Sequence, residues 1–269
     1  MLGFRQGFLA RCVGLVAAAV AGLCACAAAD AEPFVWRVCS TDIVVPPYLS
    51  GDPNHPGLVE QRLTDAGREV GLSVLLLRYP LRRCSGMFER GEVDSIILTP
   101  AGAEGRGRLP MKGGAVDYGR RIARLNLIWV RRADAAYDWD GTRISGAAPG
   151  QPLLVGTRTS FFVVADRFAA LGLRQDDAAL STHQVLAKLE ARRVDLVLAL
   201  QEEVEYALRD PALADLVVLP RAYASLDYFP IVHDGLPPEL QAKVDAWWTA
   251  IGRLRASQDH EAPPPRRKR

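Results

Sequence analysis

Short apolar runs alternate along the chain with segments whose apolar residues recur every three or four positions. The first pattern is typical of buried strands and the second of one helix face. Val59, Leu63, Ala66 and Val70, for example, share such a face before Gly71. The pattern predicts strands over 34–38, 72–77, 93–98, 125–130, 153–155, 194–200 and 216–219, with helices over 57–71, 82–90, 160–172, 181–192 and after Pro238. Strands that alternate with helices of this length predict an α/β fold with mostly parallel sheets.

One junction occurs twice, about a hundred residues apart. Arg90-Gly91-Glu92-Val93-Asp94 precedes the apolar run 95–98, and Arg192-Arg193-Val194-Asp195 precedes the run 196–198. In both places a predicted helix ends in a basic turn, and an Asp opens a predicted strand. The repetition indicates two similar α/β lobes.

The first thirty residues have the pattern of a secretory signal peptide. Arg5 and Arg11 precede or open an apolar run that ends at Ala29-Asp30-Ala31, which fits a small-residue cleavage site and makes 1–31 the removed segment. Two alternatives stay open: a retained membrane anchor, and a lipid anchor at Cys26 in Leu23-Cys24-Ala25-Cys26. All three place the rest of the chain outside the cytoplasm.

The composition is that of an ordinary folded protein, with 49% hydrophobic and 24% charged residues among 269. It excludes a mostly disordered chain and a multi-pass membrane protein. The net charge of +2 is too small for a protein built to hold nucleic-acid backbone, so we expect no nucleic-acid partner. Residues 258–269 are predicted to form a disordered basic tail.

Two cysteines, Cys39 and Cys84, lie outside the targeting segment. In an oxidising compartment they are a candidate disulfide, and two buried free thiols are the alternative. The four histidines show no metal-ligand spacing, and G-x-S-x-G, H-E-x-x-H and P-loop patterns are absent from the sequence. We therefore predict no metal, no cofactor and no catalytic residues.

An ordered set of short motifs resembles the extracellular solute-binding proteins of family 3. These motifs are Pro46-Pro47-Tyr48, Pro80-Leu81-Arg82-Arg83-Cys84, Gly91-Glu92-Val93-Asp94 and Val155-Gly156-Thr157, and the resemblance covers roughly 35–254. Some members carry cysteines at positions like those of Cys39 and Cys84, so the resemblance implies a disulfide between them.

The resemblance also implies a fold, a place and a partner. The fold would be α/β and two-lobed, of the periplasmic-binding-protein-like type II, each lobe a mostly parallel sheet flanked by helices. Lobe 1 would take 32–122 and 223–257, and lobe 2 would take 123–222. The protein would be a periplasmic monomer that closes on a small polar or anionic solute and delivers it to the membrane subunits of an ABC importer.

The site that the resemblance implies lies in the cleft between the lobes. Arg106 would clamp a ligand carboxylate and Tyr48 would pack against the ligand. The second lobe would contribute the positions Thr157, Thr159, Ser160 and Gln201. Leu200 stands where amino-acid receptors carry the Asp that pairs with the ligand ammonium, so an ordinary α-amino acid fits only if Glu202 or a neighbour substitutes.

Two other functions compete with this interpretation. One is an accessory or sensory periplasmic module with a degenerate cleft. The other is a dehydratase-type enzyme on the same fold, for which Glu104, Glu202 and Glu203 would be the candidate acids by position.

Overall fold

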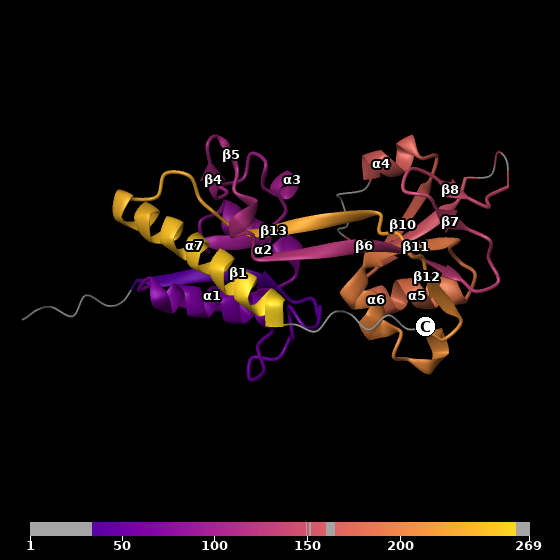
Figure 1. Cartoon of the computed structure of the whole chain (residues 1–269), viewed down its shortest axis with the longest axis horizontal. Coiled ribbons are helices and arrows are strands. Elements are labelled where there is room, and N and C mark those ends of the chain that lie inside the picture. Colours follow the sequence, from indigo (N-terminus) through magenta and orange to yellow (C-terminus); the bar gives the residue numbers. More distant parts are fainter. Residues whose placement is uncertain (1–33, 149, 151, 160–164, 262–269) are drawn as a thin grey trace, which may run out of the picture. The chain divides into compact units, whose positions relative to one another are not determined.

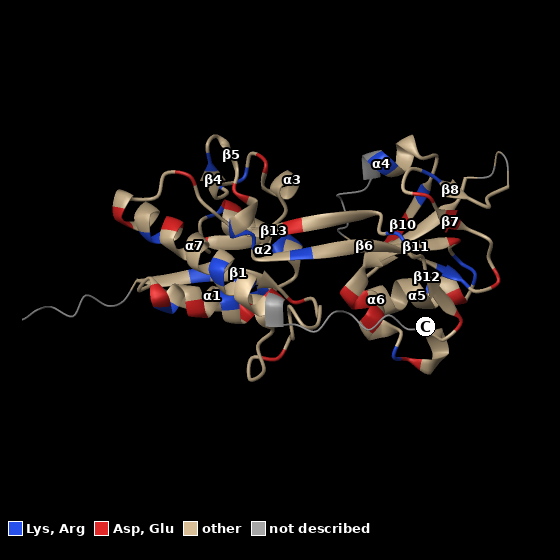
Figure 2. Cartoon of the chain, viewed as in Figure 1, with Lys and Arg blue, Asp and Glu red and all other residues tan. Residues whose placement is uncertain are grey.

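The computed structural model describes residues 34–148, 150, 152–159 and 165–261. The predicted signal peptide, Ser160 and most of the predicted tail lie outside these residues. Within them, acidic and basic residues are interspersed over the helices and strands (Figure 2).

The central sheet has the strand order β10-β9-β11-β6-β13-β3-β1-β2, and β12 also pairs with β6. Its strands are β1 Val35–Thr41, β2 Ser73–Tyr79, β3 Ser95–Leu98, β6 Ala123–Arg132, β9 Leu154–Arg158, β10 Arg174–Ala179, β11 Leu196–Leu200, β12 Leu216–Val218 and β13 Ala224–Val232. The first group, β1 to β3, and the second, β9 to β11, are parallel within themselves. The strands β6 and β13 are antiparallel to each other and lie side by side between the two groups (Figure 1). Two parallel groups joined in this way confirm the predicted α/β class.

The helices are α1 Leu58–Glu69, α2 Leu81–Glu89, α3 Pro100–Ala103, α4 Ala165–Ala170, α5 Thr182–Glu190, α6 Gln201–Ala207 and α7 Pro238–Glu261. The described residues also form two short hairpins, β4–β5 (Met111–Lys112, Ala115–Val116) and β7–β8 (Asp138–Trp139, Ile144–Ser145). They further include 3-10 turns at Tyr118–Arg120 and Pro211–Leu213. The sequence pattern predicts neither α3 nor α6. Helix α6 follows β11 without a Gly, Pro or capping side chain to mark the change.

The repeated Asp junction has a structural reason. Asp94 accepts a hydrogen bond from Arg37 N at 2.7 Å, and its own N–H donates to Arg37 O at 2.8 Å. Asp195 makes the same two contacts with Leu154, both at 2.8 Å. Each Asp therefore links the beginning of the strand that follows it to the neighbouring parallel strand. Asp94 links β3 to β1, and Asp195 links β11 to β9.

The disulfide implied by the resemblance is present. Cys39 on β1 and Cys84 on α2 are bonded, with their Cα atoms 5.6 Å apart. Both are buried with Phe88, Ile96 and Ile231 in one apolar cluster. The bond holds α2 against the sheet at the end where β1 and β2 finish.

The last helix packs its apolar stripe in the core. Val244, Trp247 and Ile251 are fully buried, and the Trp247 indole donates to Leu63 O of α1 at 3.1 Å. The predicted tail boundary at residue 258 is wrong, because α7 continues to Glu261. The boundaries of the two lobes stay predictions.

The final turn of α7 is held by a buried cation. The Arg62 side chain is fully buried, and its guanidinium donates to Gln258 Oε1 at 2.8 Å, Asp259 Oδ1 at 2.8 Å and Ile122 O at 2.6 Å. The apolar periodicity carries no information about this polar contact, which explains the early tail boundary.

Truncating the chain after Ser257 is expected to lower the free energy of unfolding by about 2 kcal/mol, because Arg62 then loses two of its partners while it stays buried. Urea unfolding measures the effect. Truncation after Glu261 is the control and should leave stability unchanged. Equal stability of the two truncated proteins would show that the contact is not stabilising.

Candidate functional site

One cavity among the described residues lies at the carboxyl ends of two parallel strand pairs. Its volume is about 870 Å³, and it is bordered by the segments that follow β1, β2, β9 and β10 together with α6. Residues that matter for its chemistry are Asp42, Arg82, Arg158, Thr159, Thr182 and Glu203. Ligands of open α/β sheets bind beyond the carboxyl ends of strands, where the helices and turns present polar groups.

A buried ion pair forms part of the cavity lining. Arg158 at the end of β9 lies 3.5 Å from Glu203 of α6, and these side chains are only 14% and 5% exposed. The Thr182 hydroxyl also donates to Glu203. Within the described part of the chain, Glu203 Oε1 and Arg158 Nε make no hydrogen bond. The pair therefore keeps hydrogen-bonding capacity that its own contacts leave unused.

Two tyrosines outside the cavity lining, Tyr228 on β13 and Tyr48 in the loop before α1, are affected by the charges of this region. Burial raises the pKa of Tyr228 on β13, Glu203 raises it further, and Arg158 opposes the shift. Burial also raises the pKa of Tyr48, and the second contribution comes from the Glu202 carboxylate. Both tyrosines thus stay protonated, as hydrogen-bond donors, at neutral pH.

Glu202 at the start of α6 is a carboxylate in an unfavourable environment. Burial is the main cause that raises its pKa from 4.5 to about 7, and Glu205 and Glu203 add to the shift against a hydrogen bond from its own backbone. Its Oε2 atom is buried and has no hydrogen-bond partner among the described residues. Ionising this group therefore costs folding energy.

The stability of the protein is expected to fall as the pH rises from about 4.5 to about 7 because of Glu202. In this window the folded protein keeps a proton that the unfolded chain has released, so unfolding releases a proton, and the loss is complete above the folded-state pKa. With allowance for solvent screening, Glu202→Gln should remove a dependence of about 2 kcal/mol.

Urea unfolding at several pH values measures the Glu202 effect. The exposed Glu89 on α2 provides the control, and Glu89→Gln should keep the native pH profile. A native profile in Glu202→Gln as well would show that Glu202 is ionised at low cost.

Of the site residues predicted from the sequence, the structure places Thr159 in the cavity lining. Thr157 is buried in β9, and its hydroxyl accepts a hydrogen bond from Gln175 Nε2 at 2.7 Å. Gln201 contacts Asn126 at 3.2 Å and Glu205 at 2.8 Å, outside the cavity lining. Ser160 lies outside the described residues.

Two further predicted residues lie away from this cavity lining. Arg106 is exposed in the loop after α3, where its backbone N–H donates to Ala103 O. Tyr48 is half-buried beside the main hydrophobic core. The sequence motifs do not indicate Arg158, although it stands between Thr157 and Thr159, and they give Glu203 only as a candidate acid.

A polar ladder follows one face of β6 and β13. Arg124 donates twice to Asp227 at 2.8 Å, and the Ser225 hydroxyl donates to Asn126 Oδ1 at 2.7 Å. Both are directly opposed pairs in the antiparallel register. Since Asn126 also contacts Gln201, the ladder ties the two long strands to the start of α6.

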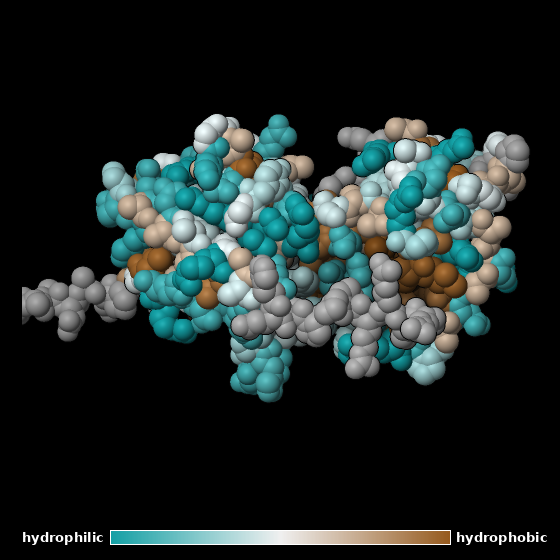
Figure 3. Space-filling model, in the orientation of Figure 1, coloured by the Kyte–Doolittle hydropathy of each residue, from teal (hydrophilic) through white to brown (hydrophobic). Residues whose placement is uncertain are grey.

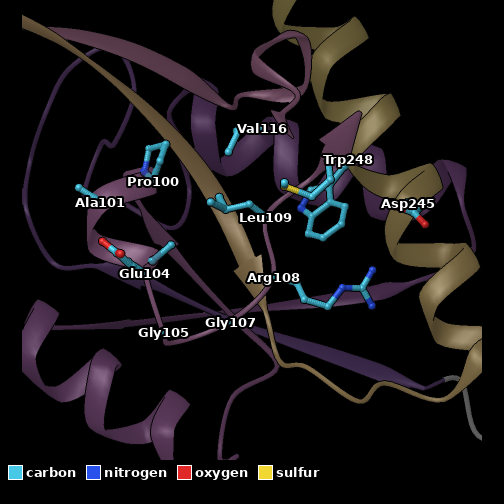
Figure 4. A pocket seen from close by; sticks show the side chains of 12 residues that line it. Pro100, Ala101, Glu104, Gly105, Gly107, Arg108, Leu109, Val116, Asp245 and Trp248 are labelled. Atoms are coloured by element: carbon cyan, nitrogen blue, oxygen red, sulfur yellow. The ribbon is translucent and has the colours of Figure 1, made fainter. Parts of the chain in front are cut away.

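A second cavity, of about 730 Å³, lies between α3, the β4–β5 hairpin and α7. Figure 4 shows Leu109, Val116 and Trp248 around it, with the side chains of Glu104 and Arg108 pointing away from each other. Among its described lining residues, Glu104, Arg108 and Asp245 form no ion pair with one another, whereas Arg158 and Glu203 form one in the larger cavity. We therefore treat the larger cavity as the candidate site.

Two features that other classes of function need are absent from the described residues. No group of three or more His, Cys, Asp or Glu side chains there is arranged to hold a metal ion. None of the described helices combines the length and the apolar character needed to cross a membrane.

Comparison with solved structures identifies the fold. A histidine kinase sensor domain with similarity to periplasmic binding proteins matches 86% of this chain and 94% of its own, with TM-score 0.61 and 17% identity. The GluR0 ligand-binding core in complex with L-glutamate matches 84% and 98%, with TM-score 0.62 and 12% identity. An ancestral arginine-binding protein bound to arginine matches 84% and 95%, with TM-score 0.60 and 13% identity.

The chain thus has the two-lobed type II periplasmic-binding-protein fold, as the resemblance to family 3 solute-binding proteins implied. No protein-family model matches the sequence, and no curated protein does. At 12–17% identity these similarities establish the fold and do not identify the ligand, so the ligand has to be inferred from the side chains of the site.

Proposed function

We propose that this protein is a periplasmic receptor that binds a small solute with an anionic group in the cavity of Arg158 and Glu203. The single observation that carries the proposal is this buried ion pair with unused hydrogen-bonding capacity at the carboxyl ends of the strands. A guanidinium is the side chain best suited to pair with a carboxylate in such a place.

The carboxylate of this pair can take the role of the ammonium-binding Asp, whose position in amino-acid receptors is occupied here by Leu200. Helix α6 begins directly after Leu200 and brings Glu203 into the cavity lining, where its carboxylate accepts from Thr182. A solute that carries a donor group next to its anionic group would meet both members of the pair. Glu203 therefore supplies the substitute that an ammonium-bearing solute needs.

The finer part of the proposal is delivery of the solute to an ABC importer, with the mature chain exported as a monomer. A specific observation favours a second candidate: the sensor domain of a histidine kinase has the same fold. In a sensory or accessory module the Arg158–Glu203 pair would stay paired with itself, and the cavity would bind no free solute.

A thermal-shift screen of the mature chain against carboxylates, amino acids, sugars and polyamines tests the proposal. A ligand at a hundredfold excess over its Kd stabilises by about 2.7 kcal/mol, which is a shift of roughly 5–10 °C for a chain of this size. The proposal predicts such a shift for at least one anionic solute, which is recovered unchanged after incubation. A uniformly flat screen would favour the sensory module, and conversion of the solute would indicate an enzyme.

A further inference from the structure

Large apolar side chains are exposed at few places in the described part of the chain, and three of them line one cavity. Leu180 is 74% exposed, Tyr206 is 49% exposed and Val44 is 40% exposed, and all three line the cavity of Arg158 and Glu203. They come from the segment after β10, from α6 and from the segment after β1. Hydrophobic residues cover only parts of the face drawn in Figure 3. Exposed apolar side chains gathered in the lining of one cavity, beside polar groups, offer a surface that a ligand can cover.

Two of these residues, Leu180 and Tyr206, lie in segments that have local contacts of their own. Leu180 directly precedes the cap of α5, and its N–H donates to Gln184 Oε1 at 2.9 Å while Ser181 accepts from Gln184 N at 3.2 Å. Tyr206 lies on α6, one turn after Glu203, with the Arg209 guanidinium 5.3 Å from its ring centre. Exposure of Leu180 and Tyr206 is thus a consequence of the same elements that position the polar groups.

The lining of the cavity consequently divides into two parts. The polar part is Arg158, Glu203, Thr159 and Thr182. The apolar part adds the half-buried Ile43 and Leu81 to the three exposed side chains. The rest of the lining consists of the charged residues Arg82, Arg209 and Asp42, the pair His183–Asp210, and Pro80, Ser181 and Ala207. A small, fully polar solute would satisfy the first part and leave the second in water.

We infer that the solute is amphipathic, with a charged head at Arg158 and Glu203 and a branched aliphatic or aromatic body against Val44, Leu180 and Tyr206. This inference rests on the proposed function and adds the chemistry of the solute body to it. The cavity volume of about 870 Å³ is within the range of sites for ligands of this type. Covering the apolar part removes it from water and favours the larger body.

Ligand pairs that share a head group test the inference by calorimetric titration. The pairs are acetate against 3-phenylpropionate, and glycine against leucine and phenylalanine, with malate as a fully polar anion. In each pair that binds, the apolar member is expected to bind at least about tenfold more tightly, as burial of a few methylene groups allows. The advantage should fall severalfold in Leu180→Asn. Leu75→Asn, which changes an exposed Leu outside the cavity, is the matched control and should keep it.

The outcomes separate the inference from the function on which it rests. Equal affinities within every pair, or tighter binding of malate, would overturn the inference and leave the receptor function standing. An apolar advantage that Leu180→Asn keeps in full would also overturn it, because the body would then lie elsewhere. Absence of binding by every ligand, with a flat thermal-shift screen, would remove the receptor function and the inference together.

Discussion

Replacing Cys39 and Cys84 together by alanine is expected to lower the free energy of unfolding by about 4 kcal/mol. The bond closes a separation of 45 residues, and in the chain-entropy model a loop of this length stabilises the folded state by that amount, roughly. Both cysteines are buried in the apolar cluster that also contains Phe88 and Ile96. At this chain length the loss corresponds to a fall of about 10 °C in Tm.

Urea unfolding with and without a thiol reductant measures the disulfide effect. The native protein should lose stability when it is reduced, and the double variant should be indifferent to reductant. A change below about 1 kcal/mol in the double variant would mean that the unfolded chain is compact enough to make the cross-link redundant.

Arg158→Met is expected to weaken binding of the anionic solute by about 10- to 100-fold, the usual range for losing hydrogen bonds to a charged group. Methionine keeps much of the aliphatic bulk of the arginine and removes the charge. Arg106→Met is the matched control, because Arg106 is exposed and lies outside the cavity lining, and it should change the affinity by less than about twofold. Calorimetric titration measures both.

A second variant separates binding from folding at this position. Arg158→Met leaves Glu203 buried without its cation, which destabilises the fold. Arg158→Lys keeps the charge without the two-pronged geometry, and it should stay folded while losing part of the affinity. Native affinity in both variants would show that Arg158 does not bind the anionic group. A larger loss of affinity in Arg106→Met would show that Arg106 binds it, as the sequence motifs imply.

The sequence predicts most strands of the central sheet and most helices in the correct order, because buried strands and amphipathic helices carry a hydrophobic period. It misses the strands β10 and β13 and the helices α3 and α6. Helix α1 and strand β3 are found within two residues of their predicted bounds. The period says nothing of the buried polar contacts. Arg62 and its partners at the end of α7 give no apolar signal, so the tail is predicted to begin at residue 258, before the helix ends at Glu261.

The candidate site could be located only in part. The motif around Gly156 and Thr157 marks the correct strand end, but alternation along β9 places Thr157 against Gln175 and the neighbouring Arg158 at the cavity. Which face of a strand meets a cavity depends on the packing of the sheet. Placing Glu203 in the cavity lining requires a prediction of helix α6, and α6 begins without a capping side chain that the sequence would show.

The most direct test of the central claim is to observe where a solute from the screen binds. Amide chemical shifts of the ¹⁵N-labelled mature protein, followed during titration, should change most at Thr159, Leu180, Ser181 and Glu203, around the larger cavity. The same changes should be reduced in Arg158→Met. Changes concentrated at Leu109, Val116 and Trp248 would place the solute in the other cavity and would contradict the account.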